Sequence, residues 1–218
     1  MNIFLKFFKI SVVYTNYTKD DKTKFTVEKM KKLLLVVCLV FSMFACEIQQ
    51  VLAVDYSRIS TNAKIVSALD SLYEINRRDV ISILNGNNAT RKPIRVMFRD
   101  LNMFGYGDAE AITARTKNNG LVIYISSEHR GASPECIACL IAHESQHHTF
   151  TNTKAEELRA WISETQAWTE FVKRNQDLVA SSEPLAKREN TIAKIRTKGG
   201  VQGIQKLIAT NPVYAGLN

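Results

Sequence analysis

The chain has 218 residues, 45% of them apolar and 23% charged, which suits one globular domain with extra sequence at an end and excludes a long disordered or fibrous protein. The formal net charge is +8, and half of it comes from residues 1–53, where eight Lys stand against four acidic residues. The remaining excess is scattered, without the dense basic stripe of a nucleic-acid-binding surface, so we expect no nucleic-acid partner.

The N-terminal part predicts export. Met30-Lys31-Lys32 precedes thirteen mostly apolar residues, 33–45, which is the pattern of a secretory signal peptide. This run is shorter than the roughly 20 residues that a membrane span needs. We therefore assign 30–53 to a signal peptide and treat 1–29 as a mis-assigned start or an extension. Detection of peptides from 1–29 by mass spectrometry of cells would contradict a start at Met30.

The predicted signal peptide can end in two ways. Val51-Leu52-Ala53 has small residues where a signal peptidase requires them, so that 54–218 would be a single exported domain. Alternatively, Met43-Phe44-Ala45-Cys46 resembles a lipobox, and Cys46 would then carry a lipid. Either way we expect a periplasmic or secreted domain that touches the membrane only through the signal peptide or this lipid. The pattern does not indicate an oligomeric state.

The exported part begins with a predicted helix. Apolar residues recur three and four positions apart from Ile65 to Leu84, so the segment is amphipathic. Ser60 or Thr61 can cap its start, and the Asn-rich turn 85–88 ends it.

A small sheet is expected next. Residues 93–99 and 109–115 alternate apolar and polar side chains, which predicts two strands. After a turn at 117–120, the β-branched and aromatic run Leu121–Ser126 predicts a third strand. We expect a small antiparallel sheet and hence an α+β fold.

Helices fill the rest of the chain. Ser133 is a favoured N-cap, Pro134 suits the first helical position, and the helix that they start is expected to run through His147. The spacing Thr153-x-x-Glu156 is a capping box that starts a second helix. Further helices are predicted from 184 to the Gly199-Gly200 break and over 201–209.

The sequence His143-Glu144-Ser145-Gln146-His147 predicts a metal site. Two histidines four residues apart share one face of a helix, so both imidazoles can reach one zinc ion at about 2.0–2.1 Å. Glu144 projects beside them and can act as a general base towards water. We expect Zn²⁺ as the cofactor and peptide hydrolysis as the reaction.

A catalytic zinc ion needs a third protein ligand, and Glu157 is the candidate. The capping box occupies Glu156, whereas Glu157 lies on an otherwise apolar face with Trp161 and Glu164. Two buried carboxylates need partners. A zinc ion would be the partner of Glu157, and a histidine ring N–H or a main-chain group would be the partner of Glu164. For Glu164, an exposed pair with a nearby Arg is the alternative.

This pattern resembles the gluzincin metallopeptidases, in which HExxH is followed by a glutamate, often as ExxA, here Glu157-Leu158-Arg159-Ala160. The order of elements over about 60–175 is similar to that of the small minigluzincins. The resemblance implies a zincin-like core with His143, His147 and Glu157 as ligands and Glu144 as the base.

The resemblance also implies further groups around the site. An edge strand would pair with an extended peptide, which assigns Val122 and Tyr124 to substrate binding. The family usually has a Tyr, His or Arg for the oxyanion, and the candidates in this chain are Arg159, His148 and Tyr214.

Other residues with metal-binding chemistry have plainer interpretations. Cys136 and Cys139 are too far along a helix to share an ion with His147. They are either core residues or a disulfide. His129 is expected to be a solvated loop residue. A redox role for the cysteines lacks the βαβ pattern of thioredoxin-like proteins.

Two functions stay open at this level. The first is an exported zinc peptidase. The alternative is a non-catalytic exported binding protein on the same fold, with a structural metal closed by a fourth protein ligand.

Overall fold

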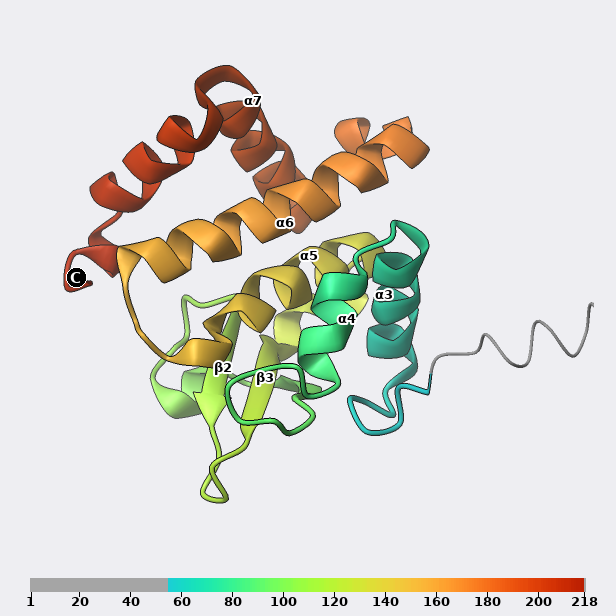
Figure 1. Ribbon diagram of the computed structural model, residues 1–218. Helices are drawn as coiled ribbons and strands as arrows, with labels where there is room; N and C mark the ends of the chain where they lie inside the picture. Colours follow the sequence, from blue (N-terminus) through green and yellow to red (C-terminus); the bar gives the residue numbers. More distant parts are fainter. Residues whose placement is uncertain (1–54, 218) are drawn as a thin grey trace, which may run out of the picture. The chain divides into compact units, whose positions relative to one another are not determined.

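The computed structural model describes residues 55–217. The predicted signal peptide, its cleavage after Ala53 and the lipidation at Cys46 therefore lie outside the described residues. Helices and one small sheet make up the described part (Figure 1), so the predicted α+β class is confirmed. No helix within 55–217 is both long enough and apolar enough to cross a membrane.

The first predicted helix is two helices, α3 (Ala63–Glu74) and α4 (Arg78–Leu84). Asn62, rather than Ser60 or Thr61, caps α3 by accepting from the next main-chain N–H groups. The break falls at Asn76, whose φ of 62° is left-handed, a conformation that Asn tolerates and that ends a helix. The Arg77 side chain then bonds to Ser163 and thereby ties the break to α6 (Lys154–Arg174).

The sheet contains β1 (Arg95–Arg99), β2 (Ala111–Arg115) and β3 (Leu121–Ser126), in the order β1-β3-β2. The β2–β3 pair is antiparallel, but β1 runs parallel to β3. The predicted antiparallel sheet is therefore wrong for one of its two pairings, and the sheet is mixed. The most apolar strand lies in the centre, where both of its edges are covered.

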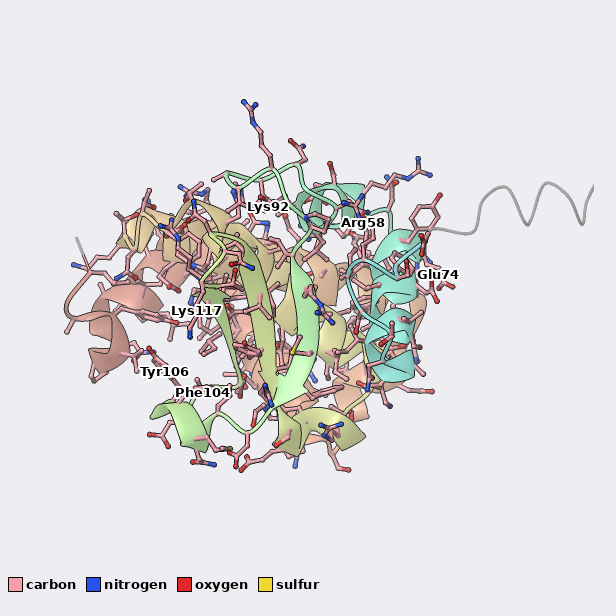
Figure 2. The ribbon with its side chains drawn as sticks, turned by 90° about the horizontal axis from the view of Figure 1, so that it is seen from below. Arg58, Glu74, Lys92, Phe104, Tyr106 and Lys117 are labelled. Atoms are coloured by element: carbon pink, nitrogen blue, oxygen red, sulfur yellow. The ribbon has the colours of Figure 1, made fainter. Side chains whose placement is uncertain are left out.

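One face of the sheet packs on the helices, as the view in Figure 2 shows with the sheet in front of them. Val96, Phe98 and Ile123 point to this inner face and are buried. Thr113 of β2 points the same way, because it is paired with Ile123 in the register. The inner face of β2 is therefore directed at the end of α5 (Pro134–Glu144).

α6 crosses α5, and α7 (Pro184–Thr210) folds back along α6 (Figure 1). Gly200, with φ 58° and ψ −150°, interrupts α7, as the Gly pair predicts. Gly203 allows the second half to approach the first, since a Cβ there would meet the Ile195 carbonyl oxygen at 2.9 Å. Trp161 packs with three isoleucines of α7: Ile192, Ile204 and Ile208.

Short 3₁₀ turns connect these elements. They are η2 (Asn102–Phe104), η3 (Ser127–Gly131), η4 (Ser145–Thr149), η5 (Gln176–Ala180) and η6 (Pro212–Tyr214). η6 brings the C-terminal segment back to the start of α6, next to the candidate site.

Candidate metal centre

α5 brings His143 and Glu144 to the wall of a cavity. Ser133 caps the helix as predicted, with its Oγ accepting from the Cys136 N–H. The helix ends at Glu144, and His147 lies in the 3₁₀ turn η4 with φ −78° and ψ 16°. The predicted single α-helix through His147 is therefore wrong in its last turn. The two imidazoles still face each other, with ring centroids 5.3 Å apart.

His143, Glu144 and His147 form a group that could bind a metal ion. Each offers one ligand atom, and these atoms lie within 4.8 Å of one another. His143 and Glu144 are buried, and His147 is partly buried. Imidazole nitrogens and carboxylate oxygens are ligands for several divalent metals, so the group by itself does not define which metal binds.

Glu157 faces both histidines from the first turn of α6. Its Oε2 is 3.8 Å from His143 Nε2, and its Oε1 is 3.6 Å from His147 Nε2. Both distances are too long for hydrogen bonds. Glu157 Oε2 is buried and has no hydrogen-bond partner in the described part of the chain. Burial raises the pKa of this carboxyl despite the nearby histidines.

Glu164, two turns further along the same face of α6, accepts a hydrogen bond from His143. Its Oε2 is 2.7 Å from His143 Nδ1, which confirms the expectation of a histidine ring N–H for this carboxylate. With the proton on Nδ1, the His143 Nε2 atom is unprotonated and its lone pair can bind a metal ion on the side of Glu157. Burial alone would lower the pKa of His143, but the charge of Glu164 and its hydrogen bond raise it.

Glu156 is used by the turn before α6. Its Oε2 accepts from the Asn152 N–H at 2.8 Å, and its Oε1 accepts from Thr149 Oγ1. Thr153 Oγ1 in turn accepts from the Glu156 N–H at 3.2 Å. In a standard capping box the Glu156 side chain would accept from the N–H of the cap residue, Thr153. Here it accepts from the N–H of Asn152, one residue earlier. Glu156 is nonetheless occupied, and Glu157 is the carboxylate that faces the histidines.

Glu144 lies between the cavity and β2. Thr113 Oγ1 is 2.8 Å from both the main-chain O and the Oε2 of Glu144, and its one proton can go to either. The cavity has a volume of about 870 Å³. Its lining includes β2, both histidines, Glu157 and the C-terminal segment from Asn211 to Leu217.

Glu164 also pairs with an arginine, as the alternative interpretation of this residue expected, but the pair is buried rather than exposed and belongs to an ionic network that the sequence did not predict. The Arg188 guanidinium of α7 pairs with Glu164, Glu189 and Glu110, and it also lies 4.9 Å over the Trp161 ring. Burial alone would raise the pKa of Glu164, but Arg188 and His143 lower it to about 2. Burial and the Glu164 charge raise the pKa of the fully buried Glu189 well above its ordinary value.

The sequence did not predict this network, because Arg188 is 24 residues from Glu164 and lies on a C-terminal helix beyond residues 60–175, the part that resembles the minigluzincins. The one available signal is Glu189, an acidic residue on the Leu185–Ile192 apolar face of α7, where a buried carboxylate requires a partner.

The strand assigned to substrate binding is not an edge strand. β3 is hydrogen-bonded to β1 on one side and to β2 on the other. Its main chain therefore has no free edge, and the assignment of Val122 and Tyr124 to substrate pairing is wrong. β3 is instead the central strand of the sheet, and β2 is the edge strand that lines the cavity.

Of the three oxyanion candidates, only Tyr214 lines the cavity. Its Oη accepts from Trp161 Nε1 at 3.2 Å. Burial and the neighbouring Glu157 charge raise the pKa of Tyr214, so its hydroxyl keeps its proton. Arg159 is exposed on α6, and His148 is half-buried with Nδ1 unpartnered.

Cys136 and Cys139 are free thiols buried in the core. The interpretation as packed core residues is confirmed, and the disulfide is absent. Burial raises the pKa of both thiols, which keeps them protonated. His129, in η3, is half-buried rather than fully solvated, and it does not line the cavity.

A comparison of the chain with protein-family models, with curated proteins and with solved structures finds no match.

Proposed function

We propose that the protein is a zinc-dependent peptidase of the gluzincin type, in which His143, His147 and Glu157 hold the ion. The convergence of the two Nε2 atoms on the Glu157 carboxylate, at 3.8 and 3.6 Å, carries this proposal. Donor atoms around a tetrahedral ion with bonds of about 2.0–2.2 Å lie about 3.4 Å apart. An ion between these three groups would also supply the missing partner of Glu157 Oε2.

The charges around the histidines support a divalent cation. Glu144, Glu157 and Glu164 bring three carboxylates next to two imidazoles, and Arg188 is shared among Glu164 and two other glutamates. Two imidazoles and one carboxylate, with a position left open, form the ligand set of several catalytic zinc sites. When bound, zinc would polarise a peptide carbonyl and lower the pKa of a water molecule.

Glu144 is the general base in this proposal. Thr113 Oγ1 can donate to Glu144 Oε2 or to the Glu144 main-chain O. The other carboxylate oxygen has no hydrogen bond within residues 55–217 and can take a proton from the attacking water. Glu144 then delivers that proton to the leaving amine. Tyr214 is the candidate for binding the oxyanion, because its hydroxyl accepts from Trp161 and can donate its own proton into the cavity.

The edge of β2 supports an extended peptide as substrate. Glu110 O accepts from Ser126 N, and Thr116 N donates to Gly120 O, so alternate residues of β2 pair with β3. The residues between them, Ala111, Thr113 and Arg115, direct their main-chain N–H and C=O groups to the free edge. A peptide that adds a strand there would lie beside Glu144.

The second candidate is a non-catalytic metal-containing binding protein. It is favoured by the grouping of Glu144 with the two histidines, because Glu144 as a fourth ligand would close the coordination shell. The predicted signal peptide at 30–53 supports an exported setting for either function.

Replacement of the general base separates the two functions. We expect the zinc-loaded wild type to cleave members of an unbiased peptide library and Glu144→Gln to lose at least about 10²–10⁴-fold in kcat/KM while retaining its zinc. Glu128→Gln, an exposed change in η3, is the control and should cleave normally. Full activity of Glu144→Gln would refute the mechanism, and loss of zinc from it would favour the closed structural site.

A further inference from the structure

Arg115 lies at one end of the cavity and has no ionic partner among residues 55–217. It is the last residue of β2 and lines the same cavity as His143 and Glu144. Within residues 55–217 its guanidinium makes no salt bridge and no side-chain hydrogen bond. The other guanidinium of the cavity lining, Arg188, is paired with three glutamates.

Phe150 holds the Arg115 side chain in place. The Arg115 Cζ lies 4.6 Å from the centre of the Phe150 ring. Phe150 has a left-handed φ of 53°, which is unfavourable for a bulky residue, and it is the C-cap of η4, three residues after His147. A guanidinium stacked on a ring keeps its N–H groups free in its own plane, where they can bind a carboxylate with two hydrogen bonds.

The register of β2 fixes the distance between Arg115 and the candidate reaction centre. Thr113 contacts Glu144, and Arg115 is two residues further along the same free edge, about 6.8 Å away. Both side chains point to the inner face of the sheet, because they are paired with Ile123 and Leu121. A peptide added to this edge would therefore present a residue near Arg115 when its scissile bond lies beside Glu144.

The two ends of β2 differ in charge. Asp108 and Glu110 precede the strand and line the cavity at its other end, where Glu110 is paired with Arg188. The glutamates in the middle of the cavity have other contacts. Glu144 lies against Thr113, Glu156 accepts hydrogen bonds in the turn before α6, and Glu157 faces the two histidines. Among the described side chains of the cavity lining, the unpaired guanidinium lies at the Arg115 end, so this end can complement an anionic group of a substrate.

We propose that Arg115 makes the protein selective for peptides that carry a carboxylate about two residues from the cleaved bond, on the side that faces Phe150. The carboxylate can be an Asp or Glu side chain or the C-terminal carboxylate of the peptide. This inference rests on the proposed peptidase function and names the substrate class for that site.

The test uses matched fluorogenic peptides and the zinc-loaded full-length protein. One series exchanges Glu for Gln at each position around the cleaved bond, and a second exchanges the C-terminal acid for its amide. We expect one of these exchanges to lower kcat/KM of the wild type by about 10- to 100-fold, the effect of one charge-assisted, bidentate contact. The responding series identifies the source of the carboxylate.

Two variants assign the selectivity to Arg115. In Arg115→Gln the ratio of kcat/KM between acidic and neutral peptides should fall close to one, and in Arg115→Glu it should fall below one. Lys117→Gln, on the β2–β3 turn (Figure 2), changes the same net charge outside the cavity and should keep the wild-type ratio. A wild-type ratio near one, or a ratio that survives in Arg115→Gln, would overturn the inference.

A binding measurement separates this inference from the proposed function. Fluorescence anisotropy of the same peptides on zinc-loaded Glu144→Gln reports recognition without turnover. If no peptide is cleaved but acidic peptides still bind in an Arg115-dependent way, the peptidase function fails and carboxylate recognition stands. If peptides are cleaved or bound without any preference for the carboxylate, the inference fails while peptide recognition stands. If the peptides are neither cleaved nor bound, both the proposed function and this inference are overturned.

Discussion

His143 and Glu164 are joined by a hydrogen bond of 2.7 Å between Nδ1 and Oε2, although 21 residues separate them in the chain. The carboxylate is fully buried and fixes which ring nitrogen carries the proton. It thereby aims His143 Nε2 at Glu157, and the candidate metal centre depends on this orientation.

The Glu164–His143 bond should support metal affinity. We expect Glu164→Gln to weaken zinc binding by about 10- to 100-fold, as other carboxylate–histidine–metal partners do, because the amide cannot stabilise the ring as the carboxylate does. Glu170→Gln, near the end of the same helix, is the control, because Glu170 is partly exposed and pairs with the exposed Lys173. Zinc affinity is measured by competition with a chelating dye, and equal affinities in both variants would show that Glu164 is only structural.

The adjacent residues Glu156 and Glu157 should separate folding from metal binding. Glu157→Gln is expected to lose most zinc affinity with little loss of apo-protein stability, because the Glu157 Oε2 atom has no hydrogen-bond partner among residues 55–217. Glu156→Gln should leave zinc affinity intact and cost about 1 kcal/mol of unfolding free energy, the usual value of a helix cap. Urea unfolding of the apo proteins measures stability, and dye competition measures zinc affinity. Loss of zinc affinity in Glu156→Gln together with loss of stability in Glu157→Gln would contradict this division of roles.

Arg188 should stabilise the fold through the three glutamates around it. Arg188→Met leaves Glu164 without its strongest ionic partner, and we expect a loss of about 3–5 kcal/mol in unfolding free energy. Lys187→Met, the exposed neighbour on α7, should change stability by less than about 0.5 kcal/mol. A loss of under 1 kcal/mol for Arg188→Met at neutral pH would mean that the network does not stabilise the fold.

Glu189 should make stability depend on pH. Its pKa is raised above the ordinary 4.5 in the folded protein, so folding takes up a proton between these two values. The contribution of Glu189 is therefore complete below about pH 4.5 and is lost as the pH rises through the raised value. Glu189→Gln mimics the protonated carboxyl and should gain stability over the wild type as the pH rises from 5 to 8. Parallel pH profiles in urea unfolding would contradict this.

The parts of the structure that depend on neighbouring residues could be predicted from the sequence. Ser133 caps α5, the Thr153–Glu156 spacing starts α6, and Gly200 breaks α7, because each of these signals acts within one helical turn. The capping-box spacing also predicts that Glu156 is used in hydrogen bonds at the helix start, so that Glu157 is the carboxylate available to the histidines. The buried position of Glu164 follows from its place on the apolar face of α6.

The parts set by distant segments could not be predicted. The order β1-β3-β2 arises from tertiary packing, and local patterns do not distinguish a parallel from an antiparallel neighbour. The 3₁₀ turn at His147 has no signal in a sequence that reads as continuous helix. Arg188 reaches Glu164 only because α7 folds back along α6, which no periodicity in α7 indicates.

The central claim is that a metal ion lies between His143, His147 and Glu157 with one position open to water. A crystal structure of the zinc-loaded protein tests this most directly. We expect zinc about 2.0–2.2 Å from His143 Nε2, His147 Nε2 and a Glu157 oxygen, with Glu144 outside the shell. A zinc ion that Glu144 binds as a fourth ligand, or one that lacks Glu157, would contradict the account.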